Sequence, residues 1–180
     1  LGSEVQFTDE TWGANVVSWC WRFEGAEPES SIIQNPTVKY NEVGSYDVTL
    51  TVTNTYGDSQ TITKQRYINV TESYNMDDVT ITTCNALFYD YGGPNNNYPD
   101  NDVHVMTFKP ATDGAMIQVE FLEFNTEDGY DILRIYNGTG VGNNPGLAEL
   151  SGSSLPGKYT ASNTEGTLTF RFLSDYSYNN

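Results

Sequence analysis

Three acidic residues at the ends of two predicted strands are the strongest candidates for chemistry in this sequence. Glu127 lies in an acidic turn, and Asp131 is at the start of the alternating stretch that follows it. Asp175 comes directly after a second alternating stretch, residues 166–173. If both strands end at the same rim of a β-sandwich, the three carboxylates meet there. Because clustered carboxylates repel one another, a hard cation that takes oxygen ligands is the most economical way to hold them together.

The strands that must position these acids are visible in the residue pattern. Residues 130–136, YDILRIY, alternate like a half-buried strand and stop at the turn Asn137-Gly138. Residues 166–173, GTLTFRFL, alternate in the same way. Solvated acids in surface turns are the alternative interpretation of Glu127, Asp131 and Asp175 in so acidic a chain.

Residues 84–177 resemble a CUB domain through several stretches that follow the order of that family: Cys84, YDYGGPNNNYPDND, MTFKP, IQVEFLEFNTEDGYDILRIYNG, LAELSGSSLP and GTLTFRFLSDYS. The resemblance implies a jelly-roll-like β-sandwich with calcium bound among loops at one end. It favours the metal site over solvated acids. The implied site comprises three carboxylates, two carbonyl donors and a supporting tyrosine: Glu127, Asp131, Asp175, Tyr176, Ser177 and Tyr98. Asp128 has no counterpart among the family's ligands.

Composition limits the class of fold and partner. The chain of 180 residues has 13 Tyr and 16 Gly among many Thr and Val, which favours strands and turns. Its formal charge of −16, from 24 acidic and 8 basic residues, argues against nucleic acid or an anionic membrane as a partner. No apolar run approaches the length of a membrane span. We expect an all-β protein.

The first half shows a second set of strand patterns. Residues 17–23, VSWCWRF, alternate so that Trp19, Trp21 and Phe23 share a face with Val17. Together with Asn35-Pro36-Thr37, GSYDVTLTV and YINV, this pattern resembles a PKD domain over about residues 4–70. The resemblance implies an immunoglobulin-like sandwich that serves spacing, stability or adhesion, of a variant associated with secreted Bacteroidetes proteins.

These resemblances predict two β-sandwich domains in tandem. The PKD-like domain covers residues 1–70, a polar linker covers 71–76, and the CUB-like domain covers 77–180 without the final strand of its family. Cys20 and Cys84 fall in different halves and are too few for a disulfide framework. Because the chain begins in mid-strand without a signal peptide, we expect it to be a piece of a larger secreted protein.

The sequence offers little for catalysis. His104 is the only histidine, and it shares a predicted strand face with Met106 and Phe108, so we interpret it as a packed structural residue. The zinc peptidase motif H-E-x-x-H is absent from the sequence. We therefore expect a chain without catalytic activity of its own.

The predicted function is that of an accessory module in a secreted or cell-surface bacterial hydrolase, such as a metallopeptidase. Calcium would fix the loops of the CUB-like domain, and Tyr89, Tyr91 and Tyr178 are candidate contacts to a partner. That partner is an extracellular protein or a polysaccharide, and the module is expected to be monomeric. Two alternatives stay open: a carbohydrate-binding accessory module, which would use the same tyrosines as a stacking platform, and a purely structural spacer.

Overall fold

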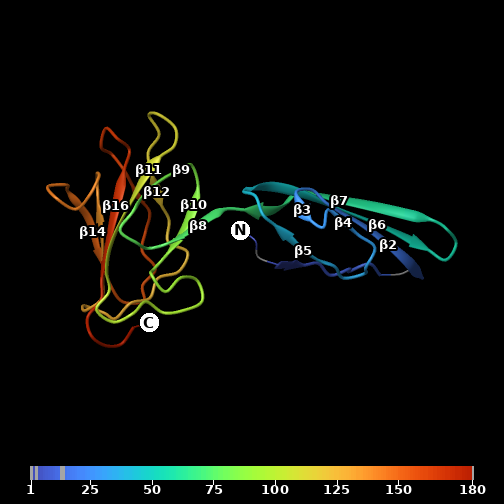
Figure 1. Cartoon of the computed structure of the whole chain (residues 1–180), viewed down its shortest axis with the longest axis horizontal. Helices are drawn as coiled ribbons and strands as arrows, with labels where there is room; N and C mark the ends of the chain where they lie inside the picture. The colour runs from blue at the N-terminus through green and yellow to red at the C-terminus, as the bar shows by residue number, and fades with distance from the viewer. Residues whose placement is uncertain (1, 3, 13–14, 180) are drawn as a thin grey trace. The chain divides into compact units, whose positions relative to one another are not determined.

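The computed structural model describes residue 2, residues 4–12 and residues 15–179, and every regular element in these ranges is a β-strand. The strands form two compact units, Leu1–Glu72 and Ser73–Asn180 (Figure 1). Each unit is a β-sandwich, which confirms the predicted fold class. The described ranges contain no helix long and apolar enough to cross a membrane.

The first unit packs a sheet of four strands, in the order β4-β2-β6-β7, against a sheet of three, in the order β1-β5-β3. Its strands are β1 (Glu4–Gln6), β2 (Val16–Phe23), β3 (Ala26–Glu27), β4 (Ser30–Ser31), β5 (Thr37–Tyr40), β6 (Gly44–Asn54) and β7 (Ser59–Val70). The core between the sheets consists of Phe7, Trp21, Phe23, Ala26, Val38, Tyr40, Val48 and Leu50.

The alternation of β2 holds for most of the strand. Trp21 and Phe23 are buried, and Trp19 is half-buried and packs against the same core. The prediction that Val17 shares this face is wrong, since 56% of Val17 is exposed. The pairing register of β2 with β6 shifts between Val16 and Ser18, and a bulge there reverses the face on which the next residue lies.

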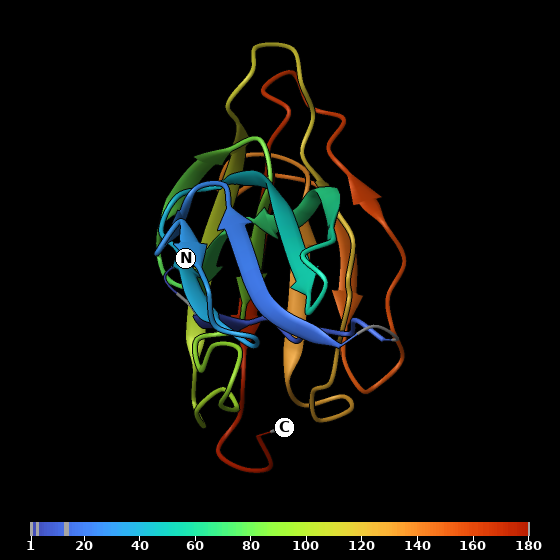
Figure 2. The same ribbon diagram turned by 90° about the vertical axis from the view of Figure 1, so that its right-hand side faces the viewer.

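The second unit is built on a five-stranded sheet in the order β14-β13-β16-β11-β9 (Figures 1 and 2). Two two-stranded sheets, β10-β8 and β12-β15, complete it. Its strands are β8 (Glu72–Asn75), β9 (Thr80–Thr83), β10 (Ala86–Tyr89), β11 (Val103–Pro110), β12 (Gln118–Val119), β13 (Ile132–Tyr136), β14 (Gly146–Leu150), β15 (Tyr159–Thr160) and β16 (Leu168–Leu173).

Strand β16 is the centre of this sheet and is antiparallel to both β13 and β11. Its residues Leu168, Phe170 and Phe172 are buried in the core of the unit. In the register of β13 and β16, Ile132 lies opposite Leu173. The residue before β13 and the residues after β16 therefore reach the same rim of the sandwich.

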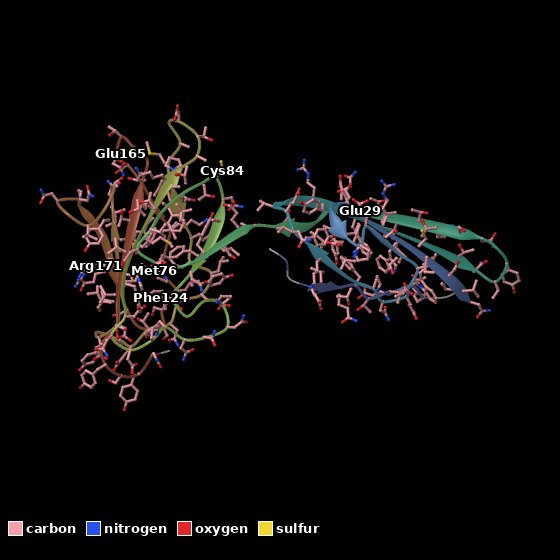
Figure 3. All side chains as sticks on the ribbon, in the orientation of Figure 1. Glu29, Met76, Cys84, Phe124, Glu165 and Arg171 are labelled. Carbon is pink, nitrogen blue, oxygen red and sulfur yellow. The ribbon has the colours of Figure 1, made fainter. Side chains whose placement is uncertain are left out.

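The opposite rim carries the loops at residues 111–116 and 161–166, which lie together in both views of the ribbon (Figures 1 and 2). Cys84 and Glu165 are near that rim (Figure 3). Cys84 is a free, exposed thiol, and so is Cys20 in the first unit. Gly166 has φ of +67°, and a Cβ there would lie 2.1 Å from the carbonyl oxygen of Ala115, so only glycine allows this close approach.

The segment expected to be a linker, residues 71–76, contains a strand. Strand β8 pairs with β10, and the Met76 N–H donates to the carbonyl oxygen of Tyr89 at 2.9 Å. Met76 is only 2% exposed, and Tyr74 packs against the core of the second unit. The polar composition of this segment gave no indication that Met76 is a core residue or that Tyr74 packs against the core.

An apolar groove of about 760 Å³ lies between β10 and the segment 116–126 in the second unit. Residues 117–124, IQVEFLEF, have the alternation of a strand, yet their backbone bonds to neighbouring segments are confined to Ile117 and β12 among the described residues. Residues 120–125 make no backbone hydrogen bond to the described part of the chain, and the next such bond is that of Thr126 to Gly152.

We therefore predict rapid hydrogen exchange at the backbone amides of residues 120–125. They should exchange on the order of 100-fold faster than the amides of β16, because exchange there needs no opening of a ladder. Exchange measured by NMR on this chain checks the prediction. Equal protection of the two segments would contradict it.

Candidate metal centre

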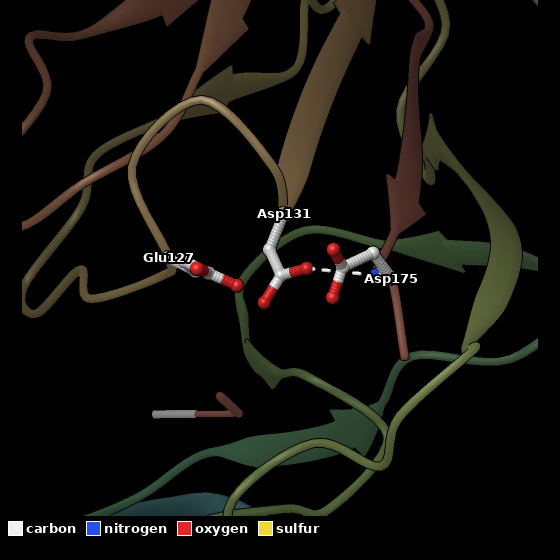
Figure 4. Close-up of side chains that lie close together, drawn as sticks. All are labelled: Glu127, Asp131 and Asp175. Carbon is white, nitrogen blue, oxygen red and sulfur yellow. Dashed lines mark hydrogen bonds between the residues drawn. The ribbon is translucent and has the colours of Figure 1, made fainter. Parts of the chain in front are cut away.

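Glu127, Asp131 and Asp175 converge at the rim of the second unit where β13 begins and β16 ends. Their carboxylates point toward one another, and one oxygen of each lies within 4.8 Å of the others (Figure 4). Two oxygens bound to the same calcium ion at about 2.4 Å each can be at most about 4.8 Å apart. The spacing of the three side chains therefore fits a single calcium ion.

Asp131 is the most constrained residue of the cluster, because it is fully buried and both of its carboxylate oxygens accept hydrogen bonds. The backbone N–H of Asp175 donates to Oδ1 at 2.8 Å, and the hydroxyl of Tyr98 donates to Oδ2 at 2.7 Å. Thr126 Oγ1 also donates to the carbonyl oxygen of Asp131 at 3.0 Å. Each carboxylate oxygen has a second lone pair, which remains available to a cation.

Glu127 is held by its backbone, and its carboxylate is poorly satisfied. Its N–H donates to the Tyr98 hydroxyl at 3.3 Å, and its carbonyl oxygen accepts the Asp131 N–H at 3.1 Å. Oε2 is buried and has no hydrogen-bond partner among the described residues. Partial burial, and after it the charges of Asp175 and Asp131, raises the pKa of Glu127 above its ordinary value.

Two backbone N–H groups, one from the following residues and one from the loop before β11, donate hydrogen bonds to Asp175. Its Oδ1 accepts the N–H of Ser177 at 2.9 Å, and its carbonyl oxygen accepts the N–H of Asn101 at 2.5 Å. No Lys, Arg or His nitrogen of the described residues lies within 4.0 Å of the carboxylates of the cluster. The described side chains thus supply no counter-charge, and a hard cation fits the donor set.

Asp128 lies outside the cluster. It accepts a hydrogen bond from the hydroxyl of Ser151 at 3.3 Å, close to Gly152. It is exposed. The turn 126–129 therefore holds two neighbouring acids in different surroundings.

The tyrosines predicted to support the metal site or to contact a partner lie in different parts of the second unit. Tyr98 is 1% exposed and belongs to the cluster, whereas Tyr89 is half-buried and lines the apolar groove. Tyr176 and Tyr178 are each 77% exposed in the segment after Asp175. Tyr130, which the sequence analysis did not single out, is also exposed beside the cluster. Its position directly before Asp131 could have identified Tyr130 from the sequence as a residue near the proposed site.

Tyr91 stacks on His104, with ring centroids 4.5 Å apart and planes 10° apart. His104 is mostly buried, as expected, but it is also paired, since its Nε2 lies 2.9 Å from Oδ1 of the buried Asp102. The sequence analysis did not predict the pair of His104 and Asp102, although residues two apart in an extended chain lie on the same face.

Comparison with known families and structures follows the division into two units. The model of the PKD domain family matches residues 1–67, and that of the CUB domain family matches residues 76–180. A solved structure of the CUB1-EGF-CUB2 domains of human MASP-1/3 is 17% identical, with a TM-score of 0.44, and the match covers 99% of this chain and 90% of that one.

A second solved structure, of carbohydrate-binding modules from a β-sandwich superfamily, is 11% identical, with a TM-score of 0.35 and coverage of 98% of this chain and 87% of that one. Both TM-scores are too low to bear on function. The two family matches are in the order predicted from the residues, and the CUB match spans more than half of the chain. The chain is a PKD domain followed by a CUB domain, and it belongs to the CUB family.

Proposed function

We propose that this chain is a calcium-binding module, with the ion held by Glu127, Asp131 and Asp175. The observation that carries the proposal is the buried Oε2 of Glu127, which has no hydrogen-bond partner among the described residues. A buried carboxylate oxygen without a donor is costly, and a bound cation removes that cost. Carbonyl oxygens of Tyr176 and Ser177, with water, would complete a coordination shell of six to eight oxygens.

The role of the ion is to order a binding surface. PKD and CUB domains are non-catalytic accessory modules. Tyr130, Tyr176 and Tyr178 are exposed and lie within three residues of Asp131 or Asp175 in the sequence, and amphipathic rings of this kind are frequent in protein interfaces. The charge of −16 favours a partner that offers basic side chains. We infer an extracellular protein as partner.

We further propose that this module is part of a larger secreted hydrolase, such as a metallopeptidase. The order of a PKD domain followed by a CUB domain supports an appended binding unit. The PKD domain would act as a spacer or adhesion unit. The CUB domain would carry the contact to substrate or partner.

Calcium should raise the melting temperature of the CUB unit. With a dissociation constant of about 10⁻⁴ to 10⁻³ M, as in extracellular modules, 10 mM calcium stabilises by roughly 1.4 to 2.7 kcal/mol. That corresponds to a rise of several degrees for a domain of this size. Thermal unfolding with and without calcium measures it.

Glu127→Gln should abolish this rise, because the amide replaces the charged ligand at nearly the same shape. Asp128→Asn is the matched control: it also removes one charge from the turn, but Asp128 bonds to Ser151 outside the cluster. The control should keep the rise. An equal response of both variants would contradict the assignment of Glu127 as a ligand.

Calcium affinity should also fall on acidification. The raised pKa of Glu127 lies above its ordinary value of 4.5, and below that raised pKa calcium must displace a proton. The apparent dissociation constant then increases about tenfold per pH unit for each proton displaced. In the absence of calcium, acidification has the opposite effect on the stability of the fold. Because the pKa of Glu127 is higher in the folded state than in the unfolded state, the free energy of unfolding increases as the pH falls.

Calorimetric titrations at a series of pH values, on the wild type and on Asp128→Asn, test this dependence. Both proteins should lose affinity together as the pH falls. Affinity that stays constant down to pH 4.5 would contradict a carboxylate ligand with a raised pKa.

A further inference from the structure

The loop at residues 90–102 connects β10 to β11 and supports the candidate metal centre at three points. Tyr98 donates to Asp131 at 2.7 Å, and the Asn101 N–H donates to the carbonyl oxygen of Asp175 at 2.5 Å. The N–H of Asp102 donates to Oγ of Ser174 at 2.7 Å, and the Ser174 N–H donates back to the carbonyl oxygen of Asp102 at 2.9 Å. The positions of two of the acids therefore depend on the path of this loop.

His104 contacts both ends of that loop. Its ring stacks on Tyr91, near the start, and its Nε2 lies 2.9 Å from Oδ1 of Asp102, at the end. At this distance Nε2 is in ion-pair contact with the carboxylate, while Nδ1 faces Asp77 and Asp78, with an oxygen of each 3.8 Å away. Asp102 is 7% exposed, so this bond is made largely out of water, where it is stronger than at the surface.

Packing alone does not explain a histidine at this position. Met106 and Phe108 continue the same strand face and belong to the apolar core, with exposures of 0% and 5%. An apolar residue at position 104 would extend that core, whereas the imidazole brings a buried polar pair with it. Such pairs cost desolvation energy and are often retained where they hold a particular geometry.

We propose that His104 is a positioning residue for the metal centre, which closes the loop 90–102 by binding Tyr91 and Asp102 at its two ends. The inference rests on the calcium site proposed above. Through Asp102 and Ser174 the closed loop holds Asp175, and through Tyr98 it holds Asp131. Calcium then meets ligands that are already in place and does not have to order them.

His104→Ala removes both contacts to the loop and should raise the calcium dissociation constant at least tenfold. Loss of a group that orients a metal ligand typically costs 10 to 100-fold in affinity. His104→Gln restores a donor to Asp102 and should recover most of the affinity. Calorimetric titration at 25 °C, on proteins shown to be folded in EDTA, gives the three constants.

Met106→Ala is the structural control. Met106 is fully buried in the same strand, so its truncation lowers the unfolding temperature in EDTA. It should leave the calcium dissociation constant within twofold of the wild type. An equal loss of affinity in Met106→Ala and His104→Ala would show that lost stability alone weakens binding, and would overturn the inference.

A double-mutant cycle separates positioning from general packing. If His104 acts through the loop that carries Tyr98, the effects of His104→Ala and Tyr98→Phe on calcium affinity are less than additive. Additive effects would overturn the proposed route. A wild type that binds calcium while His104→Ala binds it equally well overturns only the role of His104, whereas a wild type that binds no calcium overturns the site itself and this inference with it.

Discussion

Repulsion among three carboxylates at one rim is the constraint on which the CUB unit depends. The register of β13 and β16 places Asp131 and Asp175 at the same rim, and the turn before β13 adds Glu127. The fold satisfies the buried Asp131 with donors from Tyr98 and from the backbone of Asp175. It leaves Glu127 with a buried oxygen that has no hydrogen-bond partner in the described chain, and this is the feature on which the proposed cation site rests.

The scaffold beneath this rim is rigid. Asp131 directly precedes a central strand, and Tyr98 packs edge-on against Phe172 of β16, with ring centroids 4.8 Å apart. Phe172 is in turn part of the apolar core of the unit. Sites built on strand ends that are locked by a core keep their ligands in place better than sites on free loops. Tyr98 itself belongs to the loop 90–102, which contains no strand, and in our proposal the contacts of this loop to His104 compensate for the missing strand pairing.

The sequence alone predicts much of this unit, because alternation identifies the strands and the acids stand at their ends. Glu127, Asp131, Asp175 and Tyr98 could be named as one site from a family resemblance, and the structure brings these four together. The pairing of Tyr91 with His104 could not be predicted. It depends on the path of a long loop, which no local residue pattern determines.

The structure departs from the sequence predictions at two further places, Val17 and the segment 71–76. Val17 lies on the exposed face because a bulge interrupts the alternation of β2, and bulges leave little trace in a single sequence. The segment 71–76 reads as a polar linker, yet Met76 and Tyr74 in it pack against the core of the CUB unit. In this segment tertiary packing outweighs local composition.

The most direct test of this account is a calorimetric titration of the wild-type chain with calcium, run beside Glu127→Gln. The account predicts saturable binding of one calcium ion by the wild type and no measurable binding by the variant. Absence of saturable binding by the wild type, or equal binding by both proteins, would contradict the claim that these three acids form a calcium site.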